Sequence, residues 1–387
     1  MLLLASESAG KSRNVTDVAR ELSLNFAWFT DAVDLDRQLR GRARRIVLLL
    51  DADLTVGKVA VLQRAAARGP FGLVVAADRE SLRERLGQAP WDELCHLPNL
   101  EWLAPDFRRH HFRRAARECR RHLLKISRDD LQNAIRREEF CLRYQPKVMR
   151  GEGNSWRTTE AEALLRWQHP QHGSIGPLEF LPELEAFDLM PAVSEYVLRE
   201  ASRQLVEWRA QGLELNSCIN LASSQLNNAG LADEYARIVA EHGLECSSFT
   251  FEVIEQDIAD SDAPHLKVLN ELRERGFRVS LDDFGIAAAS LGTFETLPVD
   301  EIKIHAAALK RARSSPVAQK VLAAVTGLAH NLGISVCAEG VEDQETYEFL
   351  ATIECDKLQG YLISEAVMPE LIQAGYSADE VEVHAVA

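Results

Sequence analysis

The sequence predicts an α/β protein of two domains, an N-terminal open parallel sheet followed by a closed (β/α)8 barrel. Its 387 residues suit two or three domains at roughly 100–200 residues each. Short apolar runs alternate with amphipathic stretches along the chain, which is typical of β-α units. The charge changes near residue 127, from 22 basic against 16 acidic side chains before it to 22 against 43 after it.

The composition excludes several classes of protein. Hydrophobic residues make up 46% and charged residues 27%, as in folded globular domains. A net charge of −15 disfavours DNA or RNA binding, because phosphate neutralisation dominates that affinity. The seven cysteines form no CxxC pair and indicate reduced thiols. The longest aliphatic run, residues 46–50, is too short for a membrane helix. We therefore expect a cytoplasmic protein without a membrane segment.

Residues 1–107 are predicted to form the first domain. Strands are expected at residues 2–5, 27–29, 46–50, 73–76 and 100–103. Helical patterns lie between them at residues 15–24, 59–67 and 81–86. Five strands with helices on both faces resemble the receiver domain of response regulators, which belongs to the flavodoxin-like group.

The chemistry of a receiver is mostly absent from this domain. Asp51 follows the third predicted strand, where a receiver has its phosphoacceptor. Receivers also need a set of metal-binding acids after the first strand and a lysine after the fifth, but Ala5-Ser6-Glu7 and Ala104-Pro105 stand there. We expect a degenerate receiver that dimerises or binds a protein partner through residues 1–127, and labelling of Asp51 by acetyl phosphate would refute this.

A phosphate-binding loop is the alternative for residues 5–12, which read Ala-Ser-Glu-Ser-Ala-Gly-Lys-Ser. Backbone N–H groups and Lys11 would then hold phosphates at a helix start. The leading glycine of that motif is missing, and the domain is small for a nucleotide hydrolase. Failure of the domain to bind ATP or GTP would remove this alternative.

Residues 108–127 are rich in arginine. Phe112, Ala116, Cys119 and Leu123 recur among the charges at helical spacing. The pattern predicts an amphipathic basic helix. We interpret it as a solvated linker between the domains, with a docking face for the acidic second domain or for a partner as the alternative.

Residues 128–372 contain about eight further β-α repeats, the size of a (β/α)8 barrel, and residues 373–387 form an acidic tail. The predicted strands are residues 142–148, 160–166, 217–221, 249–254, 278–281, 301–304, 335–338 and 357–361. In such barrels the chemistry gathers at the C-terminal ends of the strands.

Polar residues lie at or near most of those strand ends. They are Glu162, Asn220, Glu252, Asp282, Asp283, Lys303, Glu339 and Gln359. Buried carboxylates are costly without compensating charge, and oxygen ligands suit Mg²⁺ or Mn²⁺. The set therefore predicts two divalent ions, an arrangement that splits phosphodiesters by in-line attack of water.

These residues stand in motifs that resemble the EAL-domain family, phosphodiesterases that open cyclic di-GMP to pGpG. The signature Glu162-Ala163-Leu164-Leu165-Arg166-Trp167 is complete. Around it stand Tyr144-Gln145-Pro146, Ile219-Asn220-Leu221, Glu252-Val253-Ile254-Glu255, Asp282-Asp283-Phe284-Gly285, Ala338-Glu339-Gly340 and Gln359-Gly360-Tyr361. The ordered set is specific, whereas the tripeptide alone is not.

The resemblance implies a role for each residue. The implied metal ligands are Glu162, Asn220, Glu252, Asp282 and Asp283. The implied catalytic residues are Lys303, which orients the attacking water, together with Glu339 and Glu162. Arg166 would meet a substrate phosphate, a task that suits its planar fork. Gln359 would lie in the substrate and water network, and Glu255 would brace the loop after Asp283.

That loop departs from the family pattern. Active members continue Asp-Asp-Phe-Gly-Thr-Gly-Tyr-Ser-Ser, but residues 286–289 here are Ile-Ala-Ala-Ala. Ile254 replaces a threonine, and His305 replaces an aspartate. A misplacement of about 1 Å can cost on the order of 10²-fold in rate. Two readings stay open, a homodimeric cyclic di-GMP phosphodiesterase with slowed turnover, and an impaired cyclic di-GMP receptor that signals through its pseudo-receiver.

Overall fold

The computed structural model divides the chain into two compact units, which are described separately. The first comprises Met1–Phe140 and Arg166–Phe187, and the second comprises Cys141–Leu165 and Asp188–Ala387. The structure describes residues 2–6, 15, 18, 25–40, 45–50, 54–68, 71–97, 99–124, 126–151, 156–255, 263–284 and 298–375.

The first unit contains the predicted open sheet. Its strands are β1 (Leu2–Ser6), β2 (Asn25–Phe29), β3 (Arg45–Leu50), β4 (Gly72–Ala76) and β5 (Leu100–Leu103). All pairings are parallel, and the order is β2-β1-β3-β4-β5. The expected sheet is confirmed, and its order is that of flavodoxin-like folds.

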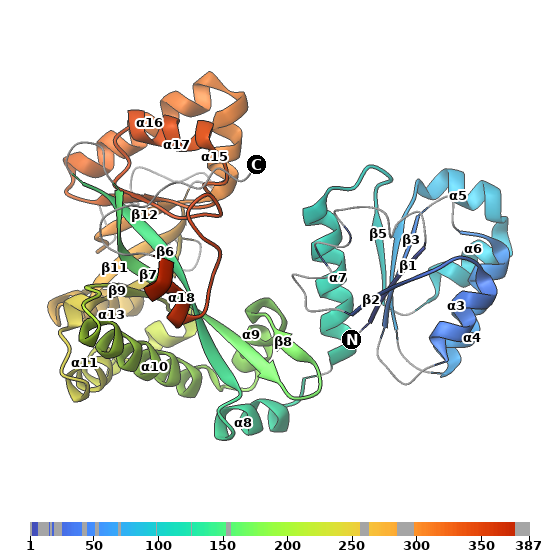
Figure 1. Cartoon of the computed structure of the whole chain (residues 1–387), viewed down its shortest axis with the longest axis horizontal. Helices are drawn as coiled ribbons and strands as arrows, with labels where there is room; N and C mark the ends of the chain where they lie inside the picture. The colour runs from blue at the N-terminus through green and yellow to red at the C-terminus, as the bar shows by residue number, and fades with distance from the viewer. Residues whose placement is uncertain are drawn as a thin grey trace. The chain divides into compact units, whose positions relative to one another are not determined.

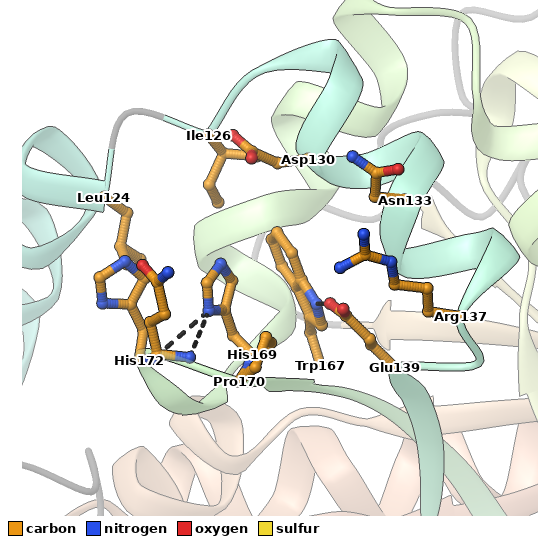
Figure 2. Close-up of a pocket in the computed structure, with 11 residues that line it drawn as sticks. Leu124, Ile126, Asp130, Asn133, Arg137, Glu139, Trp167, His169, Pro170 and His172 are labelled. Carbon is orange, nitrogen blue, oxygen red and sulfur yellow. Dashed lines mark hydrogen bonds between the residues drawn. The ribbon is translucent and has the colours of Figure 1, made fainter.

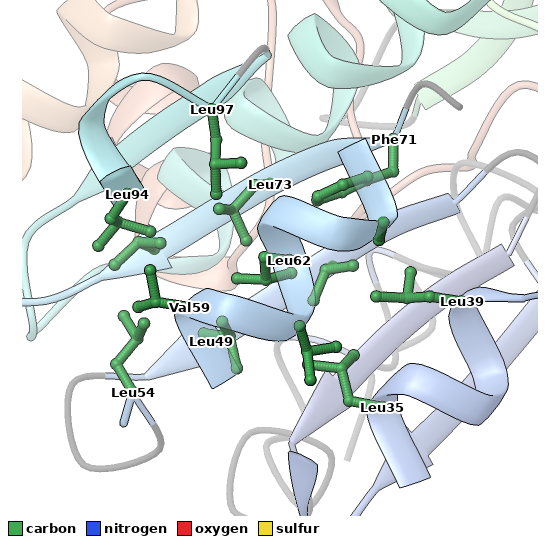
Figure 3. Packing of buried hydrophobic residues seen from close by; sticks show 14 of the residues in the cluster. Leu35, Leu39, Leu49, Leu54, Val59, Leu62, Phe71, Leu73, Leu94 and Leu97 are labelled. Carbon is green, nitrogen blue, oxygen red and sulfur yellow. The ribbon is translucent and has the colours of Figure 1, made fainter. Parts of the chain in front are cut away.

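Four helices cover one face of this sheet (Figure 1). They are α3 (Ala32–Leu39), α4 (Val56–Arg68), α5 (Arg79–Leu86) and α6 (Gln88–Cys95). Figure 3 shows their packing, with Leu35 of α3 and Leu62 of α4 in one buried cluster with Leu49 of β3. The sequence analysis missed α3 and α6. The start of α3 was readable, because Asp31 caps it by accepting the N–H groups of Val33 and Asp34.

The arginine-rich segment forms α7 (Arg109–Leu124), which covers the other face of the sheet (Figure 1). The prediction of a helix is confirmed, but its reading as a solvated linker is wrong. Phe112 and Cys119 are buried together with Val74 of β4. A Cβ at Gly72 would lie 2.5 Å from the Cβ of Cys119, so only glycine lets α7 approach β4 this closely. Of the predicted helix at residues 15–24, only Val15 and Val18 are described, both helical and buried.

The rest of the first unit consists of α8 (Arg128–Arg136), β8 (Gly173–Ile175), α9 (Pro177–Ala186) and the end of β7 (Trp156–His169). A reciprocal capping box between Ser127 and Asp130 begins α8. The ring of Phe140 lies 5.8 Å from that of Trp167 and 5.4 Å from that of Phe180. This aromatic contact holds the β7–β8 hairpin to α9.

The second unit contains the predicted barrel. Its strands, besides β7, are β6 (Phe140–Arg150), β9 (Asn216–Asn220), β10 (Phe249–Ile254), β11 (Arg278–Phe284), β12 (Glu301–Ile304), β13 (Ser335–Ala338) and β14 (Lys357–Leu358). The order β6-β14-β13-β12-β11-β10-β9-β7 closes through a β6–β7 pairing. Parallel pairings join β7, β9, β10, β11, β12, β13 and β14 in turn, but β6 pairs antiparallel with β14. The repeated β-α pattern did not predict this reversal.

Helices lie between the successive parallel strands of the barrel and after the last of them (Figure 1). They are α10 (Met190–Ala210), α11 (Leu231–Glu241), α13 (Ala263–Glu274), α15 (Ala306–Ser314), α16 (Pro316–Asn331), α17 (Gln344–Thr352) and α18 (Pro369–Gly375). Within the described ranges, none of the helices combines the length and the apolar character that crossing a bilayer requires.

Candidate functional site

The C-terminal ends of the parallel strands bring the predicted residues together. Glu162 lies on β7, Asn220 ends β9 and Glu252 lies on β10, directly beside Asn220 in the strand register. Lys303 lies on β12, and Glu339 follows β13. Because side chains alternate along a strand, all of these positions face the interior of the barrel.

Three carboxylates form the centre of the site. One oxygen from each of Glu162, Glu252 and Glu339 lies within 4.8 Å of the other two. Elsewhere among the residues that the structure describes, no such group of three His, Cys, Asp or Glu side chains occurs. We call Glu162, Glu252 and Glu339 the carboxylate cluster.

The ammonium group of Lys303 lies among these acids. Its Nζ is 2.5 Å from Oε2 of Glu252 and also donates to Glu339. It lies 3.3 Å from Oδ1 of Asp282 and 4.0 Å from Oε2 of Glu162. Burial by itself would lower the pKa of Lys303, but Glu252 and Glu162 raise it well above its usual value. Lys303 is therefore a fixed positive charge among these acids.

Two amides orient Glu162. Asn220 donates from Nδ2 to Oε1 at 2.8 Å, and Gln359 donates from Nε2 to Oε2 at 2.7 Å. Gln359 also donates to Oε1 of Gln145 at 3.2 Å. Burial opposes ionisation of Glu162, yet Lys303 and Lys147 lower its pKa below the usual value. Glu162 is thus held in one orientation as an anion.

The crowding of negative charge is visible at Glu339. The pKa of Glu339 is raised to about 7, chiefly by burial, with Lys303 lowering it and the charges of Asp282 and Glu162 adding to the rise. Burial followed by the charge of Asp282 also raises the pKa of Asp283. A bound divalent cation would relieve both effects by supplying the missing positive charge.

Asp283 has an unusual backbone. Its φ is +60°, in the left-handed region that aspartate tolerates better than most residues. Its N–H donates to Oδ1 of Asp282 at 2.8 Å. Oδ1 of Asp283 lies 3.7 Å from Nε2 of His305. The replacement histidine thus faces the second aspartate of the pair.

A further group of charges lies deeper in the barrel, and the sequence analysis missed it. Lys357 lies 2.7 Å from both Oε1 of Glu160 and Oε2 of Glu301, and Lys147 lies 4.0 Å from Glu301. All four side chains are buried. We call Lys147, Glu160, Glu301 and Lys357 the inner charge layer.

Strand periodicity could have identified this layer. Glu160, Glu301 and Lys357 each stand two residues before a predicted site residue, namely Glu162, Lys303 and Gln359. Residues two apart on a strand share a face, so charges at these positions must also point into the barrel.

The remaining predicted residues are less completely placed. Arg166 lies on β7, four residues after Glu162, and is half-buried. Glu255 is buried directly after β10. The altered residues 286–289, Asp51, and residues 7–12 of the alternative phosphate loop lie outside the described residues.

A pocket of about 260 Å³ lies in the first unit, around α8 and the β7–β8 hairpin (Figure 2). Hydrogen bonds join some of its polar groups. Trp167 donates from Nε1 to Glu139 at 2.9 Å, and Nδ1 of His169 accepts the N–H of His172 at 3.3 Å. None of the predicted site residues lines this pocket.

The comparisons with known proteins agree with this geometry. The family model for the EAL domain matches residues 128–366. A cyclic di-GMP phosphodiesterase of Pseudomonas aeruginosa is 36% identical over 244 residues, covering 63% of this chain and 41% of that protein. The cyclic di-GMP phosphodiesterase PdeR of Escherichia coli is 30% identical over 237 residues, covering 61% of this chain and 35% of that protein.

A solved structure of the PaMucR phosphodiesterase in complex with c-di-GMP is also similar. It is 35% identical, with a TM-score of 0.58, and the match covers 63% of this chain and 98% of that chain. The chain spans only about two fifths of the length of the curated relatives. Because the family model covers more than half of its residues, the chain belongs to the EAL-domain family.

Proposed function

We propose that the barrel is a divalent-cation-dependent phosphodiesterase that hydrolyses cyclic di-GMP to pGpG. The observation that carries this proposal is the carboxylate cluster, Glu162, Glu252 and Glu339, with Lys303 among its oxygens. The names of the relatives and the c-di-GMP complex of a similar barrel support the choice of substrate.

The donor set fits Mg²⁺ or Mn²⁺. The candidate ligands Glu162, Asn220, Glu252, Asp282 and Asp283 offer oxygen atoms, which these hard cations prefer. Three lysines, Lys147, Lys303 and Lys357, lie among seven carboxylates, so the set carries −4 when fully ionised. The seven are the carboxylate cluster, the pair Asp282 and Asp283, and Glu160 and Glu301 of the inner charge layer. Two divalent cations carry the matching +4, which supports a pair of ions.

Side chains of the barrel would orient the water, hold Glu162 in place and bind a substrate phosphate. Lys303 would orient the attacking water, because its ammonium already lies between Glu252 and Glu339. Gln359 would keep Glu162 oriented. Arg166 would bind a substrate phosphate through its planar guanidinium, and Glu255 would support the loop after Asp283.

The reaction adds one water to one phosphodiester. The water oxygen attacks phosphorus, the bond from phosphorus to O3′ breaks, and O3′ leaves with a proton as a hydroxyl group. When bound, the cations supply neutralisation of the phosphoryl charge and activation of the water. Glu339, which accepts from Lys303 at the mouth of the barrel, would exchange that proton.

A second candidate is a cyclic di-GMP receptor with little turnover. The specific observation in its favour is at Asp283, where His305 lies 3.7 Å away in place of the family's aspartate. Substrate binding would survive such a change more readily than catalysis, because the rate depends on the placement of the second cation.

For the whole protein we further propose a homodimer, a cytoplasmic location, and a protein partner that binds through residues 1–127. Sedimentation of the full chain with and without cyclic di-GMP tests the first. Affinity capture of the full chain with the N-terminal residues intact or deleted tests the last.

The deciding experiment incubates the full chain with cyclic di-GMP and Mn²⁺ and follows pGpG by chromatography. Multiple turnovers that Glu162→Ala abolishes support the phosphodiesterase. Binding without turnover supports the receptor. Failure to bind cyclic di-GMP at all contradicts both.

A further inference from the structure

We propose that Lys147 determines which divalent cation the site accepts, by restraining Glu252 to a single free carboxylate oxygen. This inference rests on the proposed metal site. Lys147 donates from Nζ to Oε1 of Glu252, while Lys303 lies 2.5 Å from Oε2. The two oxygens of Glu252 therefore face different surroundings, Oε2 the carboxylate cluster and Oε1 the inner charge layer.

The position of the Lys147 side chain is fixed by its burial and by its carboxylate neighbours. Its side chain is fully buried, and its second carboxylate neighbour is Oε1 of Glu301, at 4.0 Å. Glu301 is itself fixed, because Ser280 donates to it at 2.9 Å and Lys357 lies 2.7 Å from its other oxygen. A buried ammonium that leaves its partner becomes an uncompensated charge. Oε1 of Glu252 therefore stays bonded to Lys147 when a cation approaches from the cluster.

Lys303 differs in this respect. It contacts Glu339 and lies 3.3 Å from Asp282 in addition to Glu252. It can release Oε2 of Glu252 to a cation and keep carboxylate partners. Oε2 of Glu252 is thus available to bind a cation in the carboxylate cluster, whereas Oε1 stays bonded to Lys147.

One available oxygen favours small cations. Mg²⁺ requires a near-octahedral shell, whereas Ca²⁺ takes 6–8 oxygens and commonly uses both oxygens of a carboxylate. With Oε1 held by Lys147, Glu252 cannot bind Ca²⁺ through both oxygens. The lysine thereby disfavours Ca²⁺ relative to Mg²⁺ and Mn²⁺.

The experiment measures binding of Mn²⁺ and of Ca²⁺, each alone, to the full chain by titration calorimetry. In Lys147→Met, the ratio of the Ca²⁺ to the Mn²⁺ dissociation constant should fall by roughly tenfold or more, the usual scale for loss of an outer contact to a ligand. The ratio is the right quantity, since removing a positive charge strengthens the attraction of both ions alike.

Lys310→Met is the control, because it removes an exposed lysine on α15 that belongs neither to the carboxylate cluster nor to the inner charge layer. Its ratio should stay at the wild-type value. If Lys147→Met does not fold by near-UV circular dichroism, Lys147→Met/Glu301→Gln replaces it and keeps the net charge. An unchanged ratio in the Lys147 variants, or the same fall in Lys310→Met, overturns the inference. Absence of any divalent-cation binding by the wild type overturns the proposed metal site instead.

Discussion

Replacing Lys303 by methionine tests whether this lysine holds the place of a cation in the metal-free site. The change removes an ammonium group that contacts both Glu252 and Glu339. It leaves buried carboxylates without compensation, which typically costs about 3–5 kcal/mol. For a domain of this size about 1 kcal/mol corresponds to roughly 2–4 °C, so the melting temperature in EDTA should fall by about 6–20 °C.

Mn²⁺ should reverse much of this loss, because it supplies positive charge to the same oxygens. We therefore expect Mn²⁺ to raise the melting temperature of Lys303→Met more than that of the wild type. Turnover to pGpG should still fall by about 10²-fold or more, since the water is no longer oriented. Thermal melts in EDTA and in Mn²⁺, together with chromatography of pGpG, measure both effects.

Lys310→Met is the matched control, because Lys310 is exposed on α15 and should leave stability and turnover unchanged. Equal stability of Lys303→Met and wild type in EDTA would refute the idea that Lys303 compensates the carboxylates. So would an identical stabilisation of the two proteins by Mn²⁺.

Two further predictions concern protonation and packing. Because burial raises the pKa of Glu339 to about 7, the metal-free protein should lose stability as the pH rises from about 4.5 to 7, where folding must ionise a disfavoured carboxyl. Urea unfolding in EDTA at pH 5.5 and 8 measures this, and a slope that Glu339→Gln leaves unaltered would contradict it. Gly72→Ala should destabilise the protein by about 1–3 kcal/mol, since its Cβ meets that of Cys119 at 2.5 Å. Gly57→Ala on α4, whose Cβ would have a neighbour only at 4.0 Å, is the control, and equal effects at the two glycines would count against the close packing of α7.

The sequence predicted the parts of the structure that have a local signal. Apolar runs marked all five strands of the first sheet, and polar residues at strand ends marked the site from Glu162 to Gln359. The short helices α3 and α6 were missed. In α6 Leu94 is the one residue that is buried, and Pro90 lies within the helix, so the segment shows little apolar period. The burial of α7 was misread because its many arginines outweigh the few apolar residues on its inner side.

The EAL barrel, and the acids, amides and lysine that meet at its mouth, could be predicted from local sequence patterns, because the strand ends of a barrel converge whatever the details of packing. The reversal of β6 and the contacts among charges became known from the three-dimensional structure. The pairing of Lys147 with Glu252 joins residues 105 positions apart, and the pairing of Lys357 with Glu160 joins residues 197 apart. Such partners depend on strand register and side-chain reach across the closed barrel, which no local pattern records.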